Sequence, residues 1–173
     1  MTGEIRAERP VERAAIRTVH LEAFYPSPNE AYLVELLRRA GRMTFSLVAV
    51  HEGLVVGHVA FLPVTIHPTP AERIQGLALG PIGVLPAYQR KGTGSRLVCE
   101  GLEACRASGY GFVVLLGDPR YYRRFGFVPA STYRLGNDYG AGDAFMALEL
   151  QPGILREVEG LVRYPREFDQ VGC

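Results

Sequence analysis

The loop at residues 89–95 has the sequence Gln89-Arg90-Lys91-Gly92-Thr93-Gly94-Ser95. It lies between an apolar, extended segment that ends at Pro86 and an amphipathic segment that runs from about Thr93 to Ser108. Glycine lets a backbone turn tightly, and the first N–H groups of a helix have no partner inside the helix and carry partial positive charge. The loop therefore predicts an anion site, suited to a pyrophosphate group, at a strand-to-helix junction.

Two better-known phosphate motifs do not match this loop. In a P-loop a glycine directly precedes the lysine and another stands five residues further upstream, whereas here Lys91 precedes Gly92 and the upstream glycine is missing. A dinucleotide fingerprint needs a third glycine where Leu97 stands. Taken alone, the loop is equally compatible with a surface turn whose basic side chains, Arg90 and Lys91, are solvated. The neighbouring segments must decide between these interpretations.

The segments around the loop alternate between extended and helical patterns. We predict extended segments or strands at 4–9, 44–51, 54–66, 74–85, 112–116, 127–128 and 144–150. We predict helices at 10–24, 28–40, 93–108 and 119–125. This order predicts an α/β fold (α+β, with a mixed sheet) in a single domain of residues 1–173, with a core at about 4–150 that the C-terminal segment 151–173 completes. Gly80-Pro81 predicts a bulge or an interruption inside the strand at 74–85.

The apolar positions of the predicted helices indicate which faces are buried. In the first helix, helical spacing favours a face made of Val11, Ala15, Val19 and Phe24. In the helix after the glycine loop, the predicted buried face consists of Leu97, Val98, Leu102 and Cys105. Ser27 with Glu30 is typical of a capping box, and Asp118 before Pro119 is typical of a helix start.

The composition is that of an ordinary globular protein. The chain has 173 residues, of which 47% are hydrophobic and 21% charged, and its formal net charge is +1. Because nucleic-acid binders carry a clear basic excess, we expect no nucleic-acid partner. The three cysteines, Cys99, Cys105 and Cys173, form no metal or disulfide pattern, and an odd number fits a reducing cytosol. No apolar run is long enough to span a bilayer, so we predict a cytoplasmic protein with no metal and no membrane partner.

Three segments stand in a fixed order across about fifty residues. Residues 79–86, Leu79-Gly80-Pro81-Ile82-Gly83-Val84-Leu85-Pro86, precede the loop. The loop contains Gln89, Gly92 and Gly94 in a Q/R-x-x-G-x-G/A pattern, and residues 116–127 contain Tyr122 four residues before Gly126 in a Y-x-x-x-G-F pattern. In these motifs the chain resembles the GNAT superfamily of N-acetyltransferases, and in particular its YhbS-like branch.

The resemblance implies a GNAT-like acyl-CoA N-acyltransferase fold with a splayed central sheet. Acetyl-CoA, the acetyl-donor cosubstrate, would lie in the splay between the fourth and fifth strands, where backbone groups of Ile82, Gly83 and Val84 would bind the pantetheine arm and the acetyl carbonyl. The pyrophosphate would be held by the N–H groups of Gln89, Arg90, Lys91, Gly92, Thr93, Gly94 and Ser95. Tyr121 would contact the cofactor. The interruption that we infer at Gly80-Pro81 from the residues alone is what a sheet needs in order to splay.

Tyr122 is the expected catalytic residue. In GNAT enzymes the amine attacks the thioester carbonyl directly and the CoA thiolate leaves. A tyrosine, with an ordinary pKa of about 10, is protonated at neutral pH and can donate its proton to the departing sulphur. Adjacent helical residues diverge by about 100°, so only one of Tyr121 and Tyr122 can face the reacting thioester of the cofactor, and the motif register favours Tyr122.

No general base is predicted. Many GNAT enzymes carry a glutamate on the fourth strand, but Gly80-Pro81 stands at the corresponding place and cannot ionise. His58, His67 and Glu30 remain as candidates. Each has an ordinary explanation, since buried or exposed histidines are common and Glu30 belongs to the predicted capping box.

The predicted function is transfer of the acetyl group of acetyl-CoA to a primary amine of a small molecule or peptide. One alternative is a non-catalytic acyl-CoA-binding or sensing module on the same fold, which the missing glutamate favours. Another is a nucleic-acid-binding domain built on Arg120, Arg123 and Arg124, which the near-neutral charge argues against. Such an arginine cluster is usually a solvated helix face; the functional alternatives are contact with the 3′-phosphate of the cofactor or attraction of an acidic acceptor. The resemblance also allows a homodimer.

Overall fold

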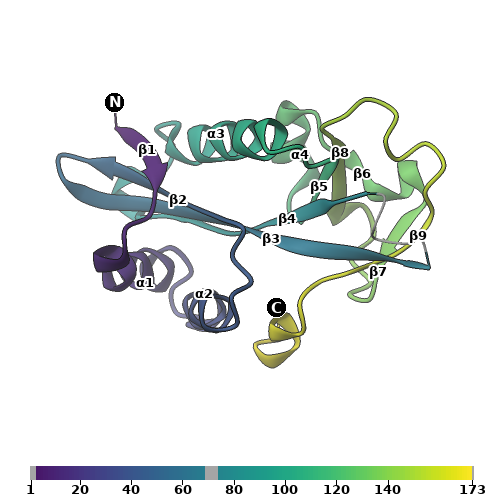
Figure 1. Cartoon of the computed structure of the whole chain (residues 1–173). Coiled ribbons are helices and arrows are strands. Elements are labelled where there is room, and N and C mark those ends of the chain that lie inside the picture. The colour runs from purple at the N-terminus through teal and green to yellow at the C-terminus, as the bar shows by residue number, and fades with distance from the viewer. Residues whose placement is uncertain (1–2, 69–73, 173) are drawn as a thin grey trace. The chain divides into compact units, whose positions relative to one another are not determined.

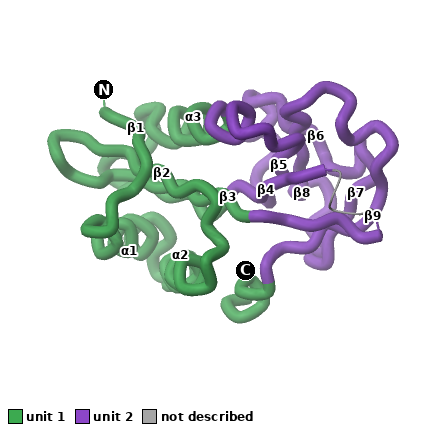
Figure 2. Tube along the Cα trace, in the orientation of Figure 1, with its two compact units in different colours: residues 1–62, 80–102, 166–173 green, residues 63–79, 103–165 purple. Residues whose placement is uncertain are grey.

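The computed structural model describes residues 3–68 and 74–172, which form two compact units (Figure 2). Unit 1 comprises residues 1–62, 80–102 and 166–173, and unit 2 comprises residues 63–79 and 103–165. Cys173 lies outside the described residues. That residues 1–173 form a single domain stays a prediction. In the described part of the chain, none of the helices has the length and apolar character needed to cross a membrane.

Unit 1 combines antiparallel strands with helices (Figure 1). Its strands are β1 (Glu4–Ala7), β2 (Phe45–His51) and most of β3 (Leu54–Pro68), which pair antiparallel in that order. Its helices are α1 (Arg13–Ala23), α2 (Asn29–Arg39), the first part of α3 (Thr93–Ala107) and three short 3-10 helices at Pro10–Glu12, Pro86–Tyr88 and Arg166–Gln170. The end of β4 (Gly76–Val84) also belongs to this unit. An apolar cluster joins α1 and α2 to β2 and β3; it contains Ile16, Val19, Val34, Val48 and Val55.

Unit 2 contains the other strand pairs. The start of β4 pairs parallel with β5 (Phe112–Leu116), and β5 pairs antiparallel with β8 (Phe145–Glu149), which pairs in turn with β6 (Val128–Pro129). β9 (Gly160–Arg163) pairs antiparallel with the end of β3 and parallel with β7 (Leu135–Asn137). The short helices are α4 (Pro119–Tyr122) and 3-10 turns at Arg123–Phe125, Ala130–Tyr133 and Gly142–Ala144. Parallel and antiparallel pairs occur together, so the predicted mixed sheet is confirmed.

Most predicted elements are present, and the differences have local causes. The predicted apolar face of α3 is buried. In contrast, Val11 is 88% exposed, because a 3-10 turn precedes α1 and rotates that residue out of register; Ile16, Val19 and His20 are the buried residues of this helix. α2 begins at Asn29, whose N–H is 3.2 Å from the Ser27 hydroxyl, and Pro28 takes the N-cap position predicted for Ser27.

Two short strands, β7 and β9, were not predicted from the sequence. Each is three or four residues long and only partly buried. Strands this short carry almost no periodicity, and their pairing depends on residues distant in the chain. Asp118, in contrast, caps α4 as predicted: its carboxylate accepts a hydrogen bond from the Arg120 N–H at 2.9 Å.

Candidate active site

The glycine loop of unit 1 has the backbone of an anion site. Gln89 Nε2 donates to the carbonyl oxygen of Val84 at 2.9 Å and so ties the loop to the end of β4. Arg90 and Gly92 adopt left-handed conformations, with φ of 61° and 87°. Alternation between left- and right-handed residues turns successive N–H groups toward one concave face. α3 begins directly afterwards, at Thr93, and adds the partial positive charge of its N-terminus.

The basic side chains near this loop differ in whether they already bind other groups of the protein. Arg90 and Lys91 are exposed, and Lys91 Nζ lies 5.8 Å from the centroid of the Tyr88 ring. Arg96 is engaged elsewhere: Nη1 donates to the Gly3 carbonyl at 2.6 Å, and Nη2 lies 3.5 Å from a Glu100 oxygen. Arg90 and Lys91 are thus the cationic side chains of the loop that are left for a ligand.

The residues of this loop fit the pyrophosphate that the family resemblance implies. A Cβ on Gly92 would meet nothing within 4 Å, so the backbone is open to an approaching group on that side. The first N–H groups of α3 have no acceptor inside the helix. Such an arrangement is the usual phosphate-binding geometry of a helix N-terminus. Which of residues 89–95 bind the cosubstrate stays a prediction.

β4 changes its pairing along its length. Its parallel register with β5 consists of three residue pairs and ends at Ala78 and Val114, although β4 continues to Val84. Gly80, two residues further on, has φ of 139°, which few side-chain-bearing residues adopt. The pairing therefore ends where Gly80-Pro81 predicted an interruption. The backbone of Ile82–Val84 lies beyond the last residue pair with β5.

A pair of buried histidines lies behind Gly83 in unit 1. His20 on α1 and His58 on β3 are both fully buried, and His20 Nε2 lies 2.8 Å from His58 Nδ1. His58 Nε2 lies 2.7 Å from the hydroxyl of Ser46 on β2. His20 Nδ1 has no hydrogen-bond partner and lies 3.1 Å from the position that a Cβ on Gly83 would take.

Burial keeps both histidines neutral. It is the main cause that lowers the pKa of His20 to about 4, and the positive charge of Arg38 lowers it further. Burial also lowers the pKa of His58 well below its ordinary value, as do His20 and Arg38. His58 was a candidate base from the sequence, whereas His20 was not predicted. The available signal was a histidine next to Val19 on the apolar face of an amphipathic helix, where a polar side chain requires a buried partner.

Tyr122 in unit 2 is held by its neighbours. Its ring lies over Gly117, where a Cβ would come within 2.5 Å of the ring, and it packs edge-on against Phe127 at 6.0 Å between centroids. Burial, and secondarily Tyr121, raises the pKa of Tyr122 to about 12. The phenol is therefore protonated at neutral pH. The Tyr121 ring contacts the Tyr122 ring edge-on, at 4.9 Å between centroids, and the Arg124 guanidinium lies 4.3 Å from the centroid of the Tyr121 ring.

The remaining candidates have local partners. Arg120 pairs with Asp118 at 3.3 Å, and Arg124 Nε donates to the Tyr121 carbonyl at 2.9 Å. His67 is exposed, with Nε2 3.1 Å from the Thr65 hydroxyl. These contacts favour the interpretation of the arginine cluster as a solvated helix face. Among the described residues, no group of three His, Cys, Asp or Glu side chains is placed to hold a metal ion.

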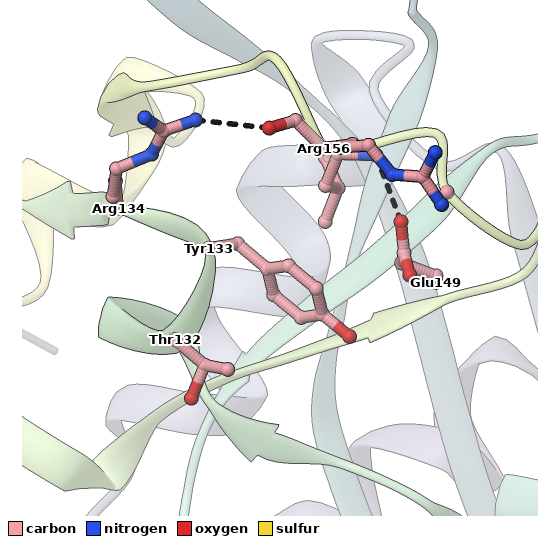
Figure 3. A pocket seen from close by; sticks show the side chains of 7 residues that line it. Thr132, Tyr133, Arg134, Glu149 and Arg156 are labelled. Carbon is pink, nitrogen blue, oxygen red and sulfur yellow. Dashed lines mark hydrogen bonds between the residues drawn. The ribbon is translucent and has the colours of Figure 1, made fainter.

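Unit 2 also has a surface pocket of about 420 Å³ (Figure 3). It is lined by Thr132, Tyr133, Arg134, Glu149, Gly153, Leu155 and Arg156. Its polar groups are largely bonded to one another: Glu149 accepts from the Leu155 N–H at 2.8 Å, and Arg134 donates to the Arg156 carbonyl at 2.9 Å. None of the predicted site residues lines this pocket.

A mixed sheet whose fourth strand leads through a glycine loop into a helix defines an α/β protein built to hold a phosphate-bearing ligand. The particular family follows from comparison with known proteins. Residues 4–130 match the model of the acetyltransferase (GNAT) domain. The chain belongs to the GNAT family of acetyltransferases, which confirms the fold class predicted from its three motifs.

The similarity extends beyond that domain model. The uncharacterized N-acetyltransferase YhbS of Escherichia coli K12 is 38% identical over 168 residues, which are 96% of this chain and 98% of YhbS. The crystal structure of Escherichia coli YhbS in complex with CoA has a TM-score of 0.91 at 36% identity, covering 96% of this chain and 92% of that one. A GNAT family acetyltransferase from Brucella melitensis, solved with acetyl-CoA, has a TM-score of 0.79 at 39% identity, covering 97% and 99% of the two chains.

Proposed function

We propose that this GNAT protein transfers the acetyl group of acetyl-CoA to a primary amine of a small molecule or peptide. The observation that carries the proposal is the loop at 89–95, whose left-handed residues and following helix make a backbone anion site in unit 1. The two similar proteins that were solved with CoA and with acetyl-CoA support the same choice of cosubstrate.

In this proposal the loop and the end of β4 hold the cosubstrate. N–H groups between Gln89 and Ser95 bind the pyrophosphate, and Arg90 and Lys91 add positive charge. The backbone of Ile82–Val84, beyond the last pair with β5, binds the pantetheine arm as an added strand would. Tyr121 contacts the cofactor. The bound cosubstrate supplies an acetyl thioester.

Tyr122 acts as the general acid. The amine nitrogen forms a bond to the thioester carbonyl carbon, the C–S bond breaks, and its electron pair leaves with the sulphur. Tyr122 donates the phenolic proton to that sulphur and regains a proton from the attacking nitrogen. With a pKa raised to about 12, Tyr122 is fully protonated at neutral pH, which a general acid requires.

The test is turnover with acetyl-CoA and a panel of primary amines, including small diamines, amino acids and peptides, with release of free CoA thiol as the readout. A reaction without amine measures hydrolysis and serves as the control. We expect CoA release well above hydrolysis with at least one amine. Tight binding of acetyl-CoA without amine-dependent release would instead identify a sensing module, which the absence of a carboxylate at Gly80-Pro81 favours.

A further inference from the structure

Three polar side chains of unit 1 form one buried chain of hydrogen bonds. Ser46 Oγ, His58 Nε2 and Nδ1, and His20 Nε2 follow one another at 2.7 and 2.8 Å, and the two rings are nearly perpendicular, at 85°. The register of β2 and β3 explains the first contact. Val48 lies opposite His58, so Ser46, two residues earlier in the strand, lies on the same face and within diagonal reach.

Two arrangements of hydrogens satisfy this chain equally well. Each neutral histidine carries one N–H, and the serine carries one O–H. In the first arrangement both N–H groups point toward Ser46, and His20 Nδ1 is a bare acceptor. In the second, all the hydrogens are shifted by one bond, and Nδ1 carries the N–H. A proton that arrives at Nδ1 therefore displaces another proton at the serine end, and each ring carries one N–H both before and after the shift.

The groups around the His20 and His58 rings favour passing a proton along the chain over holding an extra proton on either ring. Phe24, the C-cap residue of α1, stacks on His20 at 6.0 Å between ring centroids, and Gly83 presents only backbone. The charged group that acts on both rings is Arg38 on α2, whose Nη2 is paired with Glu8 at 2.6 Å. Because burial and this positive charge disfavour an imidazolium, a second proton on either ring must move on.

The chain of hydrogen bonds ends beside the proposed acyl-binding strand. The unpartnered, fully buried Nδ1 of His20 points at Gly83, the central residue of the backbone segment proposed to hold the acetyl group. A buried polar atom without a partner is rare in proteins and calls for a partner supplied by water or ligand. The strand itself, with Gly80-Pro81 in place of a glutamate, offers no side chain that can take a proton.

We propose that the chain Ser46–His58–His20 carries away the proton that the acceptor ammonium must lose before attack, an inference that rests on the proposed acetyl transfer. The ammonium proton reaches His20 Nδ1 through one bridging water. The hydrogen of His20 Nε2 passes to His58 Nδ1, that of His58 Nε2 passes to Ser46 Oγ, and the serine hydrogen leaves to solvent. After product release the same transfers run backward: Ser46 takes a proton from solvent, and His20 Nδ1 gives its proton to the water that fills the emptied site, which restores the bare Nδ1. His20 and His58 are positioning residues in this scheme, since they act on the amine through water.

The experiment compares two acceptors with parent and variant enzymes at pH 9. One is a primary amine with a pKa near 8, as in an α-amino group, and is largely free at this pH; the other has a pKa of about 10.4, as in a lysine side chain, and is largely ammonium. His58→Gln and His20→Gln retain polar side chains that hydrogen-bond but cannot exchange donor and acceptor atoms. His67→Gln, at an exposed histidine of unit 2, is the matched control.

We expect kcat/KM of both variants to fall at least about tenfold with the acceptor of high pKa and to stay within about threefold with the acceptor of low pKa. Ser46→Ala, at the half-buried outer end, is a milder change and should show the same selectivity even if a histidine variant does not fold. Equal losses with both acceptors would mean that the chain only supports the fold, and no loss with either would also overturn the relay. A parent enzyme that acetylates neither amine, nor any other, would instead overturn the proposed function and the relay with it.

Discussion

The two compact units have different interiors. The core cluster of unit 2 is apolar throughout and consists of Val64, Ile66, Ala78, Phe112, Val114, Ala130, Leu135, Phe145, Ala147, Leu155, Val158 and Val162. Among the described residues, the buried polar or charged side chains are His20, His58 and Glu167, and all three belong to unit 1. Burying a polar group costs free energy unless a hydrogen bond compensates it. In unit 1, hydrogen bonds such as those between His20, His58 and Ser46 must therefore offset a cost that the apolar core cluster of unit 2 does not have.

The two buried histidines of unit 1 lie close to the proposed cosubstrate site, which gives a reason for the free-energy cost of burying them. Unit 1 carries the glycine loop and the end of β4, where we propose that the cosubstrate binds, and the buried histidines lie directly behind Gly83. In the proposed mechanism, Tyr122 on the short helix α4 of unit 2 donates its proton as a neutral phenol, which needs no buried charge. If the two proposals hold, removing a proton requires polar groups inside unit 1, whereas donating a proton requires none inside unit 2. Four experiments test whether the two units differ in this way.

The largest effect is expected from Tyr122→Phe in unit 2. The change removes the phenolic oxygen and keeps the ring that packs on Gly117 and Phe127. Positioned acid catalysis contributes about 10²–10⁴-fold, so kcat should fall on that scale, a barrier increase of about 3–5 kcal/mol. Affinity for acetyl-CoA, measured by calorimetry, should stay within a few-fold.

Tyr121→Phe is the matched control for this prediction and should keep most of the activity. A near-normal kcat in Tyr122→Phe, measured where the chemical step limits the rate, would refute the role of Tyr122. A collapse of activity in Tyr121→Phe alone would shift the general acid by one residue.

The next effect concerns acid stability and unit 1. His20 has a folded-state pKa of about 4 and titrates near 6.5 when unfolded, so between these values the unfolded state binds more protons. Stability is complete above pH 6.5 and decreases as the pH falls toward 4, by about 3 kcal/mol for this histidine. Urea unfolding across pH 4–8 measures the slope.

His20→Gln should flatten that slope, whereas His67→Gln should leave it unchanged. Amide exchange at pH 5 should show opening first in β2 and the first part of β3, and last in β5 and β8. A slope that is the same in His20→Gln, or simultaneous opening of both regions, would remove the contrast between the two interiors.

Gly92→Val tests the loop of unit 1. The side chain would enter the open space where we propose that the pyrophosphate lies, and would also strain a residue with φ of 87°. Loss of one charge-assisted hydrogen bond, about 1.5–3 kcal/mol, should weaken acetyl-CoA binding by about 10- to 100-fold. Gly109→Val in unit 2 imposes the same strain at φ of 86°, also in open space, and should leave calorimetric affinity unchanged. Parent-like affinity in a folded Gly92→Val variant would refute the loop assignment.

The smallest effect is expected at the N-terminal edge of unit 1. Arg6 donates to both oxygens of Glu12 at 2.6 and 3.0 Å, and this contact is the main cause that lowers the pKa of Glu12 to about 2. Glu12→Gln should cost about 1–2 kcal/mol of stability at pH 7. Because the folded-state pKa is lowered, this stabilisation is present above pH 4.5 and is lost as the pH falls through about 2, so the two proteins should converge there.

Glu103→Gln, which removes an exposed partner of Arg106, is the control and should change stability by less than about 0.5 kcal/mol. Equal losses of unfolding free energy in Glu12→Gln and Glu103→Gln would show that the partly buried Arg6–Glu12 pair stabilises the protein no more than an exposed pair does.

Several structural features of this protein could be predicted from its sequence because they depend on local chemistry. The helix start at Asp118-Pro119, the buried face of α3 and the end of the ladder near Gly80-Pro81 each follow from residues within a few positions of one another. Glycine, proline, capping groups and helical periodicity act over one or two turns of chain, so their signals survive without any tertiary context. The three motifs that identify the GNAT family are of this kind.

Tertiary structure alone decided the rest. His20 and His58 are 38 residues apart and Ser46 is 12 residues from His58, so only the docking of α1 on the sheet and the register of β2 with β3 could join them. The same holds for β9, which is identified by its pairing with the end of β3. A hydrogen bond between residues far apart in the chain has no characteristic spacing in the sequence. Its geometry depends on how helices and strands pack together, and not on the order of the residues within them.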